Sequence, residues 1–198
     1  MKQFSKEIKY LSQCDGVMKA IIDNYDNLQF STQSNAYQIL LESIIHQVIS
    51  MKAAKTVLGK FRKLFNFESF PHPKDVRNIS DEQLNSCGIG KQKIGYIRDL
   101  SSKFIDKTIQ EKLLSEMTND EVVKYLIQVK GIGKWTAEMF LIFSLGRLDV
   151  FPIDDLGIQN AIRKHYHTKT IIEMKAIAEK WKPYQTVATL YLWKSISE

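Results

Sequence analysis

The sequence predicts an all-α protein, because apolar residues recur with a helical period and the usual signs of β-strands are missing. In AYQILLESIIHQVIS (36–50), apolar side chains are spaced three and four residues apart, as on one face of an amphipathic helix. Asn-Gly and Asp-Gly turns between alternating apolar runs, which mark β-hairpins, do not occur. Because helices average about 11–12 residues, we expect roughly eight to eleven short helices.

Capping residues indicate where several helices begin. Ser34 stands where an N-cap would serve the helix of 36–50. The helical pattern continues through MKAAKTVLGKFRKLF to a break at Pro71-His72-Pro73. Residues 80–83 (SDEQ) and 118–121 (TNDE) have the pattern of capping boxes, so helices should begin near residues 81 and 119.

The composition is that of an ordered and moderately basic globular protein. The chain has 198 residues, 28 of them Lys or Arg and 22 Asp or Glu, which gives a net charge of +6. Such an excess is compatible with nucleic acid binding but is also common without it. The two cysteines, Cys14 and Cys87, are too few for a four-thiolate iron–sulfur or zinc site. His165 and His167 are interpreted as a solvated pair rather than metal ligands.

The sequence contains no segment suited to a membrane. The first residues, MKQFSKEIKYL, are charged and lack the apolar core of a signal peptide. The longest apolar run, residues 139–143, is far shorter than the roughly 20 residues that cross a bilayer. We therefore expect a cytoplasmic protein with no membrane partner.

A glycine turn, Gly131-Ile132-Gly133, joins two helical segments and is the first candidate binding element. Glycine has no Cβ, so the backbone can approach a ligand closely. The amides of Gly131, Gly133 and Lys134 would face outward at the start of a helix near Trp135, and such amides attract phosphate oxygens. The alternative is a turn that merely links two packed helices.

The same four residues, Gly-Ile-Gly-Lys, occur earlier at 88–91. This copy is either a second nucleic acid hairpin or a helix end closed by glycine. The segment that follows, QKIGYIRDL, is amphipathic and carries Lys93 and Arg98. We favour a structural turn with a secondary basic surface over residues 88–98.

An acidic pair, Asp154-Asp155, follows Pro152 and precedes a helical stretch that ends in basic residues. An Asp before a helix most often serves only as an N-cap. The pair lies about twenty residues after the glycine turn. This spacing favours a functional carboxylate placed next to a phosphate backbone that the turn binds.

Four motifs in order resemble the HhH-GPD superfamily of DNA glycosylases, at the level of the 3-methyladenine DNA glycosylase II family in a compact form. They are the glycine turn with the acidic pair, SIIHQVISMKAAKTV (43–57), CGIGKQKIGYIRDLS (87–101) and WKPYQTVATLYLWKS (181–195). Together they cover most of the chain from about residue 36. Gln185 departs from the family pattern, which has Arg there, and this weakens any role assigned to that position.

The resemblance implies a two-lobed α-helical glycosylase with its active-site cleft between the lobes, the whole chain 1–198 forming one such unit. Residues 1–35 with about 147–198 would form one lobe and about 36–146 the other, with the helix-hairpin-helix at about 121–146. It implies an enzyme that flips an alkylated purine, such as 3-methyladenine or 7-methylguanine, out of the duplex and hydrolyses its N-glycosidic bond.

The resemblance also assigns catalytic roles. Asp155 matches the catalytic carboxylate, whereas Asp154 falls at a variable position and is interpreted as a cap or a solvated residue. Bifunctional relatives carry a Schiff-base lysine at the position of Trp135, which has no amine. Lys134 is rotated by about 100° from it and should point toward phosphate. We therefore expect a monofunctional enzyme that leaves an abasic site.

By motif position, Trp135, Met139 and Trp193 would line the base pocket, with Gln47 at its mouth. Aromatic faces suit an electron-poor alkylated purine. Val48 matches the residue that enters the duplex as a wedge. For Trp135, Trp193, Met139 and Val48, packing in the core is the alternative interpretation.

On the DNA side, the family hairpin would bind a strand through Gly131, Gly133, Lys134 and Thr136. The resemblance further suggests a Na⁺ or K⁺ ion on the backbone carbonyls of Ile127, Val129 and Ile132. No cofactor is expected to be required.

The expected partner is double-stranded DNA containing damaged bases, bound by a nucleoid-associated monomer. Two alternatives stay open. The chain could be a glycosylase for other damaged or mismatched bases, or a helix-hairpin-helix DNA-binding protein without catalysis.

Overall fold

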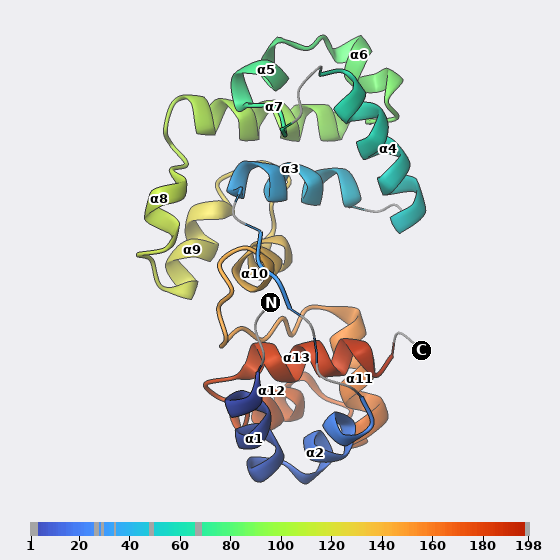
Figure 1. The fold of residues 1–198 in the computed structure, drawn as a ribbon, viewed down its shortest axis with the longest axis vertical. Helices are drawn as coiled ribbons and strands as arrows, with labels where there is room; N and C mark the ends of the chain where they lie inside the picture. The colour runs from blue at the N-terminus through green and yellow to red at the C-terminus, as the bar shows by residue number, and fades with distance from the viewer. Residues whose placement is uncertain are drawn as a thin grey trace. The chain divides into compact units, whose positions relative to one another are not determined.

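The structure is a computed structural model that describes residues 4–25, 28, 30–33, 35–47, 50–65 and 69–196. These residues form thirteen α-helices and no β-strand, so the predicted all-α class is confirmed (Figure 1). The expected number of eight to eleven helices was too low. Three of the helices are only four to six residues long, and turns this short carry too few residues to show a helical period.

The chain divides into two compact units. Unit 1 comprises Met1–Thr32 and Leu141–Glu198, and unit 2 comprises Gln33–Phe140. The helices of unit 2 are α3 (Ala36–His46), α4 (Met51–Lys63), α5 (Pro73–Asn78), α6 (Asp81–Ser86), α7 (Lys91–Ile105), α8 (Glu111–Leu114) and α9 (Asn119–Leu126). Those of unit 1 are α1 (Ser5–Cys14), α2 (Gly16–Asp23), α11 (Leu156–Tyr166), α12 (Ile171–Glu179) and α13 (Gln185–Lys194). Helix α10 (Lys134–Phe143) begins in unit 2, and its last three residues belong to unit 1.

Helix α3 supplies much of the core of unit 2. Its apolar stripe is buried at Tyr37, Leu40, Leu41, Ile44 and Ile45, and the helix packs against α7 and α4. Its N-cap is Asn35, whose side chain accepts a hydrogen bond from Gln38 N. The predicted cap Ser34 lies outside the described residues.

Capping explains several helix starts in unit 2. Both predicted boxes are confirmed, with Ser80 and Gln83 at α6 and Thr118 and Glu121 at α9. Each box satisfies two backbone N–H groups that a helix N-terminus otherwise leaves without a partner.

The earlier glycine copy ends a helix. Gly88 has φ +93°, and the amides of Gly88 and Ile89 donate to the carbonyls of Asn85 and Leu84, which is the Schellman pattern after α6. The predicted structural turn is therefore confirmed.

The basic surface expected beside this turn was a wrong prediction, because Lys93 and Arg98 turn toward backbone. Lys93 Nζ donates to Ile45 O at 2.7 Å and Gln47 O at 2.6 Å, at the C-terminal end of α3. Burial lowers the pKa of Lys93 from its usual value. Arg98 donates to Val76 O, Arg77 O and Ile79 O at the end of α5. Each cation satisfies helix-terminal carbonyls that have no partner within their helix.

Unit 1 is organised around α13, which packs against α1, α2 and α11 and buries residues on all sides. The Asp15 carboxylate ties distant parts of this unit together. It caps α2 through Val17 N and Met18 N and accepts from Tyr166 Oη and Trp181 Nε1, both at 2.9 Å. A buried carboxylate with four donors joins the start of α2, the end of α11 and the turn that follows α12.

Two smaller expectations can be compared with the structure. No helix among the described residues is long and apolar enough to span a membrane. His165 is half-buried, and its Nε2 lies 2.9 Å from Ser195 Oγ. The expectation that both histidines are solvated was therefore wrong for His165.

Candidate active site

The glycine turn between α9 and α10 has the conformation that its sequence requires. Gly131 has φ +83°, a left-handed value that disfavours other residues. A Cβ at Gly131 would lie 2.2 Å from Cδ2 of Tyr96 on α7. Gly131 is thus needed for both its backbone angle and its contact with the Tyr96 ring.

Two side chains of unit 2 hold this turn. Gln47 Nε2 donates to Gly131 O at 2.8 Å, and Lys130 N donates to Asp99 Oδ2 at 2.8 Å. Gln47 was predicted at the mouth of a base pocket, and the structure places it against the hairpin backbone. Because Lys93 holds the end of α3, the position of Gln47 is fixed from two sides.

Helix α10 starts at Lys134, one residue before the predicted start, and Gly133 O accepts its first backbone bond from Ala137 N. Gly133 is exposed and has no atom within 4 Å of where a Cβ would stand. The Lys134 ammonium lies 3.5 Å from Glu138 Oε1 and is exposed. Thr136 is only 4% exposed, so its side chain is not available to an external ligand. An exposed glycine at a helix N-terminus makes this end of α10 a candidate phosphate site.

The predicted cation ligands lie around the same turn. Ile127 is the C-cap of α9, and the carbonyl of Val129 accepts from Ile132 N at 3.0 Å. Val129 and Ile132 are buried, whereas Ile127 is 48% exposed. The predicted wedge Val48 lies outside the described residues.

Asp155 is the N-cap of α11 in unit 1. Its Oδ1 accepts from Ile158 N at 2.8 Å and from Trp193 Nε1 at 3.0 Å. Gly157 leaves room for this arrangement, since a Cβ there would lie 3.0 Å from Oδ1. The capping role suggested for Asp154 belongs to Asp155, and Asp154 is exposed. Two N–H donors on one oxygen fix the orientation of the carboxylate plane.

Aromatic rings extend from one face of the indole that bonds Asp155. The rings of Trp193 and Phe143 are stacked, with centroids 5.9 Å apart and planes 21° apart, and Phe30 lies 6.0 Å from Phe143. Phe143 is 38% exposed. Sequence reasoning missed Phe143 and Phe30, because each lies in an apolar segment that is typical of core.

The residues predicted to line the base pocket belong to both units. Trp193 lies with Asp155 in unit 1, whereas Trp135, Met139 and Gln47 lie in unit 2. Trp135 is 43% exposed at the start of α10, and Met139 is half-buried one turn later. The exposure of Trp135 argues against the alternative that it is an ordinary core residue.

A helix-hairpin-helix followed by a fixed carboxylate at a helix N-terminus defines a class of DNA-repair proteins. Residues 41–185 match the HhH-GPD superfamily of base excision DNA repair proteins, and the chain belongs to this family. The family prediction is confirmed.

Three comparisons describe the likeness more closely. DNA-3-methyladenine glycosylase 1 of Schizosaccharomyces pombe is 34% identical over 179 residues, which cover 88% of this chain and 78% of the relative. The crystal structure of a DNA-3-methyladenine glycosidase from Bacillus halodurans has TM-score 0.88 and 34% identity, covering 98% of this chain and 91% of that one. The structure of an S. pombe 3-methyladenine DNA glycosylase in complex with abasic DNA has TM-score 0.88 and 31% identity, with 98% of both chains covered.

Proposed function

We propose that this protein is a monofunctional DNA glycosylase that hydrolyses the N-glycosidic bond of alkylated purines, such as 3-methyladenine and 7-methylguanine, and leaves an abasic site. The observation that carries the proposal is the Asp155 carboxylate, fixed by Ile158 N and Trp193 Nε1 at the start of α11. It stands in a chain 34% identical to a DNA-3-methyladenine glycosylase.

The chemistry requires one carboxylate and one water molecule. As the bond between the sugar C1′ and the purine nitrogen breaks, its electron pair leaves with the base and the sugar develops oxocarbenium character. Asp155 stabilises this positive charge electrostatically. It also orients water, or takes its proton, so that the water oxygen bonds to C1′ and a hydroxyl replaces the base.

The substrate class is supported by charge and by the aromatic residues. Alkylation at N3 or N7 makes a purine cationic, which weakens its glycosidic bond and strengthens its attraction to aromatic faces. We assign this stacking role to Trp193 with Phe143 in unit 1 and to Trp135 in unit 2. Extrusion of the base costs a few kcal/mol, and a damaged base is extruded more easily than a sound one.

The hairpin is the proposed DNA-binding element. The backbone amides of Gly131, Gly133 and Lys134 take a phosphate oxygen, a contact that positions the duplex without reading its sequence. The carbonyls of Ile127, Val129 and Ile132 are proposed to hold a monovalent cation beside it. Oxygen donors of this kind fit such an ion, and Val129 O, which accepts one bond from Ile132 N, has a second lone pair. No cofactor is proposed for the reaction itself.

Monofunctional chemistry follows from Trp135, because an indole cannot form the Schiff base that a lyase needs. The proposed partner is duplex DNA with damaged bases, bound by a monomer that works on chromosomal DNA.

The test is to incubate the protein with N-methylated duplex DNA and identify the released bases by chromatography. Release of 3-methyladenine or 7-methylguanine, with strand breaks only after alkali, is the expected result. If the protein released only deaminated or mismatched bases, from duplexes that contain them, the proposed substrate class of alkylated purines would be wrong. Strand breaks without alkali would contradict the monofunctional assignment. Binding to DNA without release of any base would overturn the proposal that the protein is an enzyme.

A further inference from the structure

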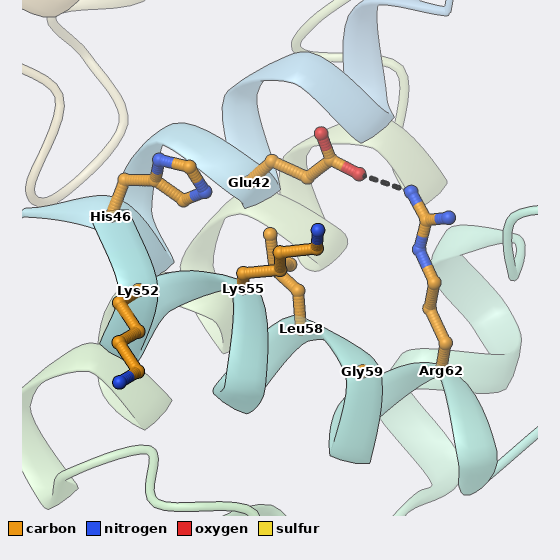
Figure 2. Close-up of a pocket in the computed structure, with 7 residues that line it drawn as sticks. All are labelled: Glu42, His46, Lys52, Lys55, Leu58, Gly59 and Arg62. Atoms are coloured by element: carbon orange, nitrogen blue, oxygen red, sulfur yellow. Dashed lines mark hydrogen bonds and ion pairs between the residues drawn. The ribbon is translucent and has the colours of Figure 1, made fainter. Parts of the chain in front are cut away.

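A groove on unit 2 is not used by the site described above. It encloses about 720 Å³ and lies between α3 and α4. Figure 2 shows Glu42 and Arg62 at one end, joined by an ion pair of 2.7 Å, with His46 and Lys52 at the other. The lining residues are Glu42, His46, Lys52, Lys55, Leu58, Gly59 and Arg62.

The charge of this groove comes from α4, which holds a large part of the basic excess of the chain. Its sequence, MKAAKTVLGKFRK, has five Lys or Arg and no Asp or Glu, in a protein whose net charge is +6. The Glu42 and Arg62 charges cancel in their ion pair. Within the part of the chain that the structure describes, neither the Lys52 nor the Lys55 ammonium pairs with a carboxylate. The groove therefore carries two lysine ammonium groups, Lys52 and Lys55, on its α4 side.

The cations are arranged along one side of α4. Lys52, Lys55, Gly59 and Arg62 follow a spacing of three, four and three residues, which keeps them within about 80° on a helix of 3.6 residues per turn. The rise of about 1.5 Å per residue spreads them over about 15 Å. Because the Arg62 charge is cancelled by Glu42, the two proposed phosphate contacts are Lys52 and Lys55, which are about 4.5 Å apart along the helix axis. A DNA strand rises about 3.4 Å per phosphate, so these two lysines match roughly one nucleotide step.

The centre of the groove is open to a ligand. Gly59 lies inside α4, where glycine costs about 1 kcal/mol relative to alanine. No atom lies within 4 Å of where its Cβ would stand, so packing does not demand a glycine here. The missing side chain lets a sugar–phosphate chain approach the helix backbone between Lys55 and Arg62.

The groove also adjoins the hairpin through the chain itself. His46 lines the groove, and the next residue, Gln47, donates to Gly131 O in the hairpin. The groove therefore begins at the residue that precedes the hairpin contact of Gln47.

We propose that the groove between α3 and α4 binds the phosphodiester backbone of DNA that continues past the hairpin, with Lys52 and Lys55 as its phosphate contacts. This inference rests on the proposed function only in taking DNA as the ligand. It adds a second contact surface, which lengthens the bound site and increases the salt dependence of binding.

The test measures how the binding constant for a 20-base-pair undamaged duplex depends on salt, in wild type and two double variants. Lys52→Gln/Lys55→Gln removes the groove cations. Lys60→Gln/Lys63→Gln is the matched control, since it removes the same charge from exposed positions of the same helix outside the groove. Each lost phosphate contact lowers the slope of log K against log salt by about 0.9, so the groove variant should lose about 1.8. Between 50 and 200 mM salt, its affinity should then fall roughly 12-fold less than that of wild type.

A loss of slope in the groove variant, with the control variant unchanged, supports the proposal. Equal losses in both variants would show a general effect of helix charge, and no loss in either would show that DNA does not reach the groove. Either of these two results overturns the proposal. Because the duplex is undamaged and no base is released, a failure of the proposed glycosylase activity would show separately, in the base-release assay.

Discussion

The replacement Gly131→Ala tests whether the hairpin is held by the contact between its backbone and the Tyr96 ring. Gly131 has φ +83°, and a Cβ there would lie 2.2, 2.5 and 2.7 Å from three atoms of that ring. The ring sits on α7, where its hydroxyl accepts a hydrogen bond from Gln92 Nε2 at 2.8 Å. The new methyl group must therefore displace either the ring or the hairpin.

Two terms set the magnitude. The left-handed conformation costs a residue with a Cβ about 1–2 kcal/mol. Forcing a methyl group into an occupied space typically costs a further 1–3 kcal/mol. We expect Gly131→Ala to lower the free energy of unfolding by about 2–5 kcal/mol, whereas Gly133→Ala, with open space around its Cβ, should lower it by less than about 1 kcal/mol.

Urea unfolding of both variants and of Gly131→Ala/Tyr96→Ala gives the answer. Removal of the ring should relieve the steric part, so the double variant should be about 1–3 kcal/mol more stable than the two single losses predict. If Gly131→Ala is as stable as Gly133→Ala, or if the double variant shows no coupling, the reasoning about the Tyr96 contact is refuted.

Three further predictions concern named hydrogen bonds. Trp193→Phe keeps an aromatic ring beside Phe143 but removes the N–H that bonds Asp155. The rate of single-turnover base release should fall about 10-fold, which corresponds to about 1.4 kcal/mol of activation free energy. An unchanged rate would contradict the role of Trp193 in positioning Asp155. Lys93→Met removes both hydrogen bonds that the Nζ group donates to carbonyls at the end of α3, and it should cost about 1–3 kcal/mol of unfolding free energy. Lys91→Met, at an exposed position of the same helix, should cost much less. Hydrogen bonds from Thr168 Oγ1 and from the Thr170 and Lys169 amides lower the pKa of Glu173 from 4.5 to about 2, so its stabilisation is present above pH 4.5 and is lost as the pH falls toward 2. Glu173→Gln should therefore be less stable than wild type at pH 6 and differ less at pH 2.5; an equal difference at both pH values would contradict the shift.

Local patterns made the helices and the hairpin predictable. The capping boxes at Ser80 and Thr118 act within four residues, and the glycine turn needs only its own backbone angles, so sequence carries this information directly. The short helix α8 has no side-chain cap and too few residues for a period, which is one reason why the count of helices was underestimated.

The contacts that sequence could not supply join residues far apart in the chain. Lys93 looks like a surface cation on an amphipathic helix, and only the packing of α3 against α7 brings the carbonyls of Ile45 and Gln47 to it. Asp155 and Trp193 are 38 positions apart, and no spacing rule predicts their hydrogen bond. Motif resemblance named both residues, but their geometry depends on the fold of unit 1.

The central claim is that the charge of Asp155 drives base release, and Asp155→Asn tests it most directly. Asn is as good an N-cap as Asp and retains an oxygen for Ile158 N and Trp193 Nε1, so the fold should be preserved while the charge is lost. Asp154→Asn is the matched control at the exposed neighbour. Single-turnover release of 3-methyladenine should fall at least about 100-fold in Asp155→Asn and stay near wild type in Asp154→Asn. Wild-type rates in both variants, or equal losses in both, would contradict the assignment of Asp155 as the catalytic carboxylate.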